Sequence, residues 1–309
     1  MTFDVNKFIK TTPKGKVMLR PGIGIFFYMD RSLPEIAPSV AKALEAYMAF
    51  IPSGTLQTYF ANNGTYATLT TRQINKDLKT LRQIPEGYEA FLFEYSQGVN
   101  GEVGTHAIYF YGTLLDIPER PLETNLFRME FPHDALTTVG IDRFMDFLVQ
   151  ISNLLPFESA NVGFAMKRSQ LYKNNVSPLV NQLLPRYLGF DPSYEDVRDE
   201  MKGHTFTAHW INIFNNELVQ RLGGEEAIRR TLPQADIRQL DHALLVRAAK
   251  LPPIGDVNRQ APDIGCLPDL ARLMIPTRLE ITGFGEPNFD PMPWLARYDN
   301  MDSRPWDNE

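Results

Sequence analysis

Hydrophobic positions in the first half of the chain repeat with two periods, and the two periods predict different elements. Helical spacing follows Ser32, where Glu35 three residues later completes a capping-box pattern. Further helices are expected over 71–81 and 141–155. Alternating or β-rich apolar runs predict strands at 22–29, 56–60, 89–95, 106–111, 125–131 and 160–166. This order favours an α+β fold, with helices packed on mostly antiparallel sheets.

The second half of the chain has shorter elements. Residues 169–200 look helical but irregular, because prolines interrupt the pattern. A strand, a helix stopped by Gly223-Gly224, a second helix, a hairpin and a last helix are expected next, at 205–214, 216–222, 225–232, 237–248 and 268–273. The chain could form one large domain or two sheet-containing lobes. We divide it into lobes 1–168 and 169–285 and a Pro/Asp-rich tail, 286–309.

Composition narrows the class of partner. The 309 residues are 43% hydrophobic and 22% charged, with a net charge of -6. An acidic surface repels nucleic-acid phosphates, so no direct nucleic-acid partner is expected, whereas a basic protein would suit it. No run of about 18 apolar residues predicts a membrane span. The polar N-terminal residues lack a signal-peptide core, so the cytoplasm is the expected location.

Candidate catalytic residues do not form a recognisable motif. His204 and His209 are five residues apart, which aligns two ligands neither on a helix nor on a strand, and neither HExxH nor G-x-S-x-G occurs. Structural, hydrogen-bonded histidines are therefore favoured, although distant residues could still form a triad. The alternative function is a hydrolase that uses His204 or His209 with Asp256. Cys266, the single cysteine, is either a small buried residue or a thiol at a helix start.

Carboxylates gather in one short stretch, YEDVRDEM, which contains Glu195, Asp196, Asp199 and Glu200. Helical spacing would make them neighbours, so three interpretations stay open: a divalent-ion site, a solvated helix start, or an acidic patch for a basic partner. Asp299 and Asp302 in the tail are further candidates for partner contact. Trp294 is expected to pack back onto the domain, and Trp306 belongs to the same region.

Five segments occur in an order typical of one protein family. They are RSLPEIAPSVAKALEAY, the run NLFRMEFP, the segment from Gly203 through Trp210, the helix end Leu222-Gly223-Gly224, and a hairpin running to Gly255-Asp256-Val257-Asn258. Together they resemble a family of bacterial immunity proteins tied to type VI secretion. The resemblance covers about residues 20–280. The chain departs from the family pattern in the late hairpin, where Asp241-His242 replaces a Gly-Gly turn.

The resemblance implies a protein that binds and neutralises a toxin encoded beside it and that protects the producing cell; the toxin it implies is a nuclease. It carries no catalytic, metal or cofactor residues over to this chain, so no enzymatic activity and no cofactor are expected. The motif residues Gly203, Trp210, Leu222, Gly223, Gly224, Gly255, Asp256 and Asn258 are expected to be structural. Homodimer formation is left open.

Overall fold

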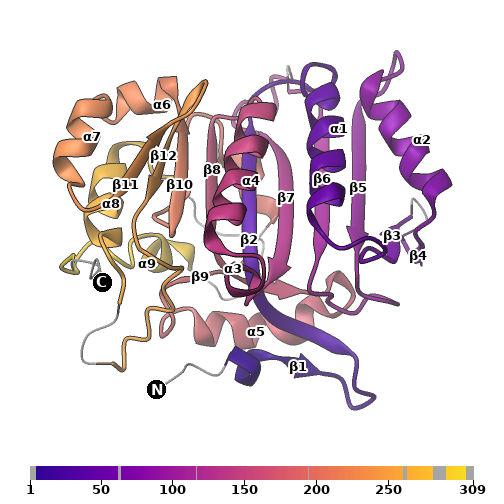
Figure 1. Ribbon diagram of the computed structural model, residues 1–309, viewed down its shortest axis with the longest axis horizontal. Coiled ribbons are helices and arrows are strands. Elements are labelled where there is room, and N and C mark those ends of the chain that lie inside the picture. Colours follow the sequence, from indigo (N-terminus) through magenta and orange to yellow (C-terminus); the bar gives the residue numbers. More distant parts are fainter. Residues whose placement is uncertain are drawn as a thin grey trace.

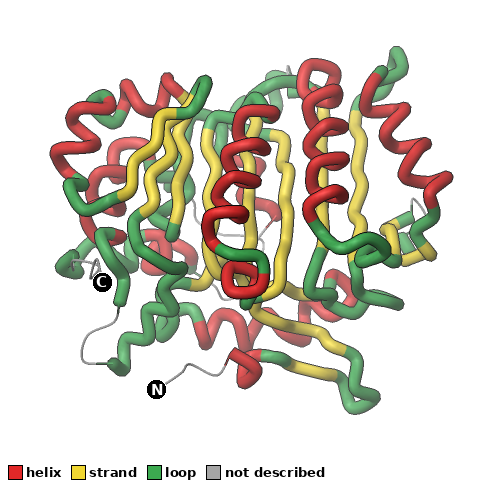
Figure 2. The backbone as a smooth tube through the Cα atoms, viewed as in Figure 1, coloured by secondary structure: helices red, strands yellow, loops and turns green. Residues whose placement is uncertain are grey.

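A 12-stranded sheet runs through the whole molecule, with helices packed against it (Figure 2). Its strand order is β11-β12-β10-β8-β2-β7-β6-β5-β3-β4, and two short strands join at the side, β1 on β2 and β9 on β8. Every pairing is antiparallel except that of β8 with β9. This computed structural model describes residues 5–61, 64–115, 117–193, 195–259, 263–280 and 290–303.

The longest strands lie at the centre of the sheet. β2 pairs with β7 on one side and β8 on the other, and its apolar run is buried almost throughout. The strands are β1 (Lys10–Thr11), β2 (Val17–Met29), β3 (Thr58–Phe60), β4 (Tyr66–Thr68), β5 (Ala90–Ser96), β6 (Ala107–Thr113), β7 (Asn125–Pro132), β8 (Ser159–Arg168), β9 (Phe190–Asp191), β10 (Ile211–Asn215), β11 (Asp236–Gln239) and β12 (Ala243–Arg247).

Three long helices, α1, α2 and α4, lie on one face of this sheet (Figure 1). The capping box is present at the start of α1, where the Ser32 backbone N–H donates to Glu35 Oε1 at 3.2 Å. The α-helices are α1 (Leu33–Phe50), α2 (Thr71–Arg82), α3 (Ala135–Thr138), α4 (Ile141–Leu154), α5 (Lys173–Leu183), α6 (Asn216–Arg221), α7 (Glu225–Thr231), α8 (Leu267–Met274) and α9 (Pro291–Leu295), and the 3-10 helices are η1 (Val5–Phe8), η2 (Gln170–Tyr172), η3 (Glu195–Glu200) and η4 (Ile275–Thr277).

Two hydrophobic clusters stabilise the fold. The larger fills the space between the sheet and α1 and α4, where Phe131 contacts Tyr47, Phe144 and Phe147 edge to face. The smaller joins α6, α7 and α8 to β10 and β12 and includes the fully buried Tyr298. The predicted α+β class with mostly antiparallel pairing is confirmed.

The sheet continues across residue 168. Strand β10 pairs with β8, so that Ile213 lies opposite Ala160, and β12 and β11 extend the sheet beyond it. The division into parts 1–168, 169–285 and 286–309 stays a prediction about independent folding. Within the last part, the described residues 290–303 include α9, and Trp294 there is buried, as expected; Trp306 lies outside the described residues.

One predicted strand is wrong in extent. Residues 205–214 were expected to be extended throughout, yet β10 begins only at Ile211. The Thr207 carbonyl accepts from His209 Nδ1 at 2.8 Å and from Asn212 Nδ2 at 3.0 Å, and the His209 N–H donates to Asn212 Oδ1 at 2.8 Å. These local side-chain bonds occupy backbone groups that a ladder would need. The short strands β4 and β9 lack a clear hydrophobic pattern and were not predicted, whereas β1 falls in residues 1–20, which were expected to form an arm or a first edge strand.

Candidate partner-binding surface

The acidic stretch forms a 3-10 helix, η3, whereas its sequence spacing was interpreted as that of an α-helix. With three residues per turn, positions i and i+3 lie above one another. Asp196 and Asp199 therefore share the outward side and are exposed, as is Glu200. Glu195 and Arg198 share the inward side, where Arg198 covers the Tyr111 ring at 4.2 Å. The helix thus presents three carboxylates to solvent on a base fixed to the sheet.

Glu195 anchors η3 to a charged network on the sheet. Its carboxylate accepts from Arg128 Nη1 at 2.7 Å, and Arg128 Nε lies 3.2 Å from Glu130. Lys167 Nζ lies 3.9 Å from Glu130 and donates to the carbonyls of Gly104 and Thr105. Burial lowers the pKa of Lys167 to about 8, although Glu130 opposes that shift.

A hollow of about 480 Å³ lies beside η3. Its lining includes Glu119, Glu123, Asp199 and Glu200, together with Leu122, an apolar side chain that is 39% exposed. Burial is the main cause of the raised pKa of Asp199, and neighbouring carboxylates add to it while Arg198 opposes it. Two arginines, Arg120 and Arg198, also line the hollow and pair with Glu123 and Asp199 at 3.4 and 3.3 Å, so that Glu119 and Glu200 exceed the cations there.

The two C-terminal carboxylates differ in their surroundings. Asp299 accepts two hydrogen bonds from Arg278, at 2.6 and 2.7 Å, and is therefore already paired within the chain. Asp302 is exposed. The residues predicted to contact a partner differ in their surroundings. Asp196, Asp199, Glu200 and Asp302 are exposed, although Asp199 also lies 3.3 Å from Arg198 Nη2, whereas Glu195 and Asp299 hold other parts of the chain.

The histidines do not form the pair with Asp256 on which the alternative hydrolase function depends. Buried His209 has Nε2 at 2.8 Å from Asp191 Oδ2 and Nδ1 at 2.8 Å from the Thr207 carbonyl. Both ring nitrogens therefore already have partners within the protein, and among the described residues neither contacts a serine or cysteine that it could activate. His204 Nδ1 bonds the Lys202 carbonyl, and Asp256 instead accepts from Arg186 at 3.1 and 3.3 Å.

Cys266 is a buried residue and not a reactive thiol. Its Sγ lies 3.3 Å from the Ala248 carbonyl, and burial raises the pKa of the thiol to about 12. Among the residues that the structure describes, no group of three or more His, Cys, Asp or Glu could hold a metal ion. No helix within the described ranges is long and apolar enough to cross a membrane.

The motif around Gly203 and Trp210 joins distant parts of the chain. Gly203 has a φ of 76°, and its N–H donates to Glu158 Oε2 at 2.8 Å. Trp210 is 1% exposed, and its indole N–H donates to the Ala249 carbonyl at 2.7 Å. Its ring also lies near that of Phe144 on α4. Trp210 thus links the strand ladder, the late hairpin and a helix.

The two later motifs are turns. At the end of α6, Gly223 and Gly224 have φ of 96° and 86°, and the Gly224 N–H reaches the Val219 carbonyl at 2.9 Å, which forms a Schellman-type helix end beside buried Leu222. In the second turn, Gly255 has a φ of 63°, and the Asn258 N–H donates to Asp256 Oδ1 at 3.2 Å. The geometry explains why these positions carry Gly, Asp and Asn.

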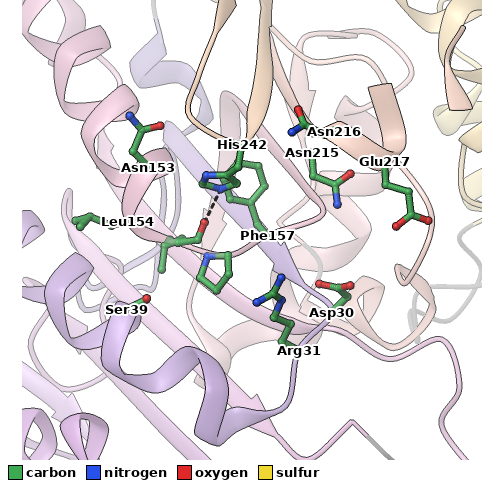
Figure 3. Close-up of a pocket in the computed structure, with 12 residues that line it drawn as sticks. Asp30, Arg31, Ser39, Asn153, Leu154, Phe157, Asn215, Asn216, Glu217 and His242 are labelled. Atoms are coloured by element: carbon green, nitrogen blue, oxygen red, sulfur yellow. Dashed lines mark hydrogen bonds between the residues drawn. The ribbon is translucent and has the colours of Figure 1, made fainter. Parts of the chain in front are cut away.

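A second hollow, of about 460 Å³, lies between the ends of α4 and β2 and the start of α6 (Figure 3). His242 donates through Nε2 to the Leu155 carbonyl at 3.0 Å, and Asn215 caps α6 through the Leu218 N–H. Asp30, Arg31 and Glu217 lie around it (Figure 3). Its polar side chains serve helix and loop ends, and they do not pair a nucleophile with a base.

One group of exposed residues on the sheet was not singled out from the sequence. Leu92 and Glu94 on β5 lie on the face opposite Phe93 and Tyr95, because strand residues alternate. The run EAFLFEY already contained this alternation. The available signal was a leucine and a glutamate on one face of a strand, but its meaning depended on knowing that α1, α2 and α4 all lie on the other face (Figure 1).

Comparisons with known proteins point in one direction. A family model described as TsiV, type VI immunity for VRR-NUC, matches residues 39–306. No curated protein matches the chain. Among solved structures, the Pseudomonas aeruginosa T6SS protein PA0821 is similar in fold, with a TM-score of 0.77 and 15% sequence identity over 96% of this chain and 86% of that chain.

Proposed function

Because the chain belongs to the TsiV family and is a type VI immunity protein against a VRR-NUC nuclease effector, we propose that it acts by tight, one-to-one binding of that effector. The effector is expected to be encoded beside it. Protection requires very few free toxin molecules, so the dissociation constant should be nanomolar or lower, about -12 kcal/mol of binding free energy. The place of action is the cytoplasm, where a nuclease would reach the cell's own nucleic acid.

The exposed side of η3 is the observation that supports an electrostatic contact. Asp196, Asp199 and Glu200 extend from a short helix whose inward side is fixed by the Glu195–Arg128 pair. Fixed carboxylates lose little freedom when a cation pairs with them. A nuclease that binds nucleic acid needs a basic surface, and this acidic surface complements it. Asp302 at the C-terminal end is a second proposed contact.

Complex formation in solution tests this function. The purified protein would be mixed with a catalytically inactive form of the neighbouring VRR-NUC effector and analysed by size-exclusion chromatography with light scattering, followed by calorimetry. A one-to-one complex with a nanomolar dissociation constant is expected. Two separate peaks and no heat of binding would show that this protein does not act by binding that effector. The free protein's mass in the same experiment reports whether two copies associate.

A further inference from the structure

One face of the sheet is left open beside β5. Helices α1, α2 and α4 cover the opposite face (Figure 1). β5 pairs with β6 along its whole length, but β3 pairs only with its last two residues, Tyr95 and Ser96, so within the described residues the edge of β5 beside Leu92 is open. Leu92 is 40% exposed there. The open edge and the exposed leucine together mark a surface available to a partner.

The side chains around Leu92 form a distinct surface. Strand register places Leu92 opposite Tyr111 and Glu94 opposite Tyr109, all on the same face. Tyr66 from β4 reaches the same place, because its hydroxyl donates to Glu94 Oε1 at 3.3 Å. We call these five residues, Tyr66, Leu92, Glu94, Tyr109 and Tyr111, the Glu94 face. Three tyrosine rings and a leucine thus surround one carboxylate.

Glu94 lacks a cation of its own. Arg128 is nearest in the network, but its guanidinium donates to Glu195 and forms an ion pair with Glu130. Lys167 is directed to Glu130 and to two backbone carbonyls. Within the described residues, no Lys, Arg or His nitrogen lies within 4.0 Å of Glu94, which is recessed yet partly exposed.

We propose that the Glu94 face receives a basic side chain, arginine or lysine, of the VRR-NUC effector. This inference rests on the proposed function and names the place of contact. A recessed carboxylate without a counter-charge gains a charge-assisted hydrogen bond from such a group. Two of the three tyrosine rings already have a cation over them, Arg128 over Tyr109 at 4.9 Å and Arg198 over Tyr111 at 4.2 Å. The incoming group is therefore held by the Glu94 carboxylate, and Leu92 packs against its aliphatic stem. η3 lies next to this face, because its Glu195 pairs with Arg128 and its Arg198 covers the Tyr111 ring. The outward carboxylates of η3 therefore extend the acidic surface.

The titration of Glu94 gives a second readout. Its pKa is raised to about 7, mainly by burial and also by Glu195 and Glu130, while Arg128 and the Tyr66 hydroxyl act in the opposite direction. Tyr109, on β6, also faces this cluster. A bound cation favours the ionised carboxylate, so binding should release a proton below pH 7. Affinity should then rise about tenfold from pH 6 to pH 8, and this rise should be absent in Glu94→Gln.

The experiment measures binding of the full chain to the catalytically inactive effector by calorimetry, at pH 6 and pH 8. Glu94→Gln removes the charge with little change in size, and Leu92→Arg places a repelling cation on an exposed position. The matched control is Glu45→Gln, an exposed carboxylate of α1 on the covered face. We expect the dissociation constant to rise tenfold or more at pH 8 in both test variants and less than twofold in the control.

The outcomes separate this inference from the proposed function. Absence of binding by the wild-type protein overturns the proposed function and the inference with it. Wild-type binding together with test variants that behave like Glu45→Gln overturns only the inference. If Glu94→Gln lowers the melting temperature strongly, Leu92→Arg decides the matter, because an exposed position tolerates the change. Weak binding by a stable Leu92→Arg variant supports the Glu94 face.

Discussion

At the scale of single residues, Trp210 shows how a sequence motif becomes a structural anchor. The sequence predicted a buried indole with a bonded N–H, and the side chain is buried with its N–H on the Ala249 carbonyl. Trp210→Ala would leave a large cavity and an unpaired carbonyl, so we expect a loss of roughly 3–5 kcal/mol in the free energy of unfolding. Urea unfolding measures this loss, with exposed Leu251→Ala as a control of near-zero effect.

Buried carboxylates make the stability depend on pH. Burial raises the pKa of both Glu94 and Glu158 to about 7 in the folded protein, above the ordinary value of 4.5. Such groups stabilise the fold below pH 4.5, and that contribution is lost as the pH rises through 7. His106 acts with the opposite sign, because burial lowers its pKa from 6.5 to about 4, and its contribution is lost as the pH falls.

A single substitution isolates the Glu94 contribution. The difference in unfolding free energy between the wild type and Glu94→Gln should shift against the wild type between pH 4.5 and pH 7.5. The expected size is of the order of 1 kcal/mol, since partial exposure reduces the effect. Urea unfolding at several pH values measures it. A pH-independent difference would show that Glu94 titrates normally in the folded protein.

At the scale of elements, turn chemistry was the most predictable part of the chain. The Leu-Gly-Gly end of α6 was expected to contain a left-handed residue, and both glycines have positive φ. Gly223→Ala or Gly224→Ala should therefore cost about 1 kcal/mol or more of unfolding free energy. Gly163→Ala is the control, because an added Cβ there meets no atom closer than 3.8 Å and its φ is not left-handed. Equal stability of all three variants would contradict this view.

The element η3 carries the main prediction on binding. Charge reversal of Asp196, Asp199 and Glu200 should weaken the complex without unfolding the protein, because all three are exposed. Reversal of Glu45, Asp146 and Glu226, which are exposed on α1, α4 and α7, is the control with the same change in net charge. Calorimetry and thermal melting measure both triples. Equal affinities would place the contact elsewhere.

Sequence reasoning located most long elements but not the surface that they form. Apolar spacing predicted α1, α2, α4 and the strands β5 to β8 within a few residues. It did not predict that η3 is a 3-10 helix, because four carboxylates in six residues fit either helix type. It also could not show that Glu195 pairs with Arg128, which is 67 residues away. Long-range ion pairs depend on tertiary contacts that local patterns do not contain.

At the scale of the whole molecule, one continuous sheet joins residues on both sides of position 168. The chain has a net charge of -6, and the exposed carboxylates of η3 contribute to it. If complementary charge steers the effector to the η3 side, the association rate should fall as salt rises, while the dissociation rate changes less. Stopped-flow mixing at low and high salt measures both rates. An association rate that does not respond to salt would exclude electrostatic steering.

The most direct test of the central claim is survival of cells that make the neighbouring VRR-NUC effector. Growth would be compared in a sensitive host that expresses the effector alone, with this protein, or with its η3 charge-reversed form. Neutralisation by binding predicts growth with the wild-type protein, reduced protection by the charge-reversed form, and recovery of a one-to-one complex from the surviving cells. Equal death of cells with and without this protein, at matched effector levels, would contradict the account.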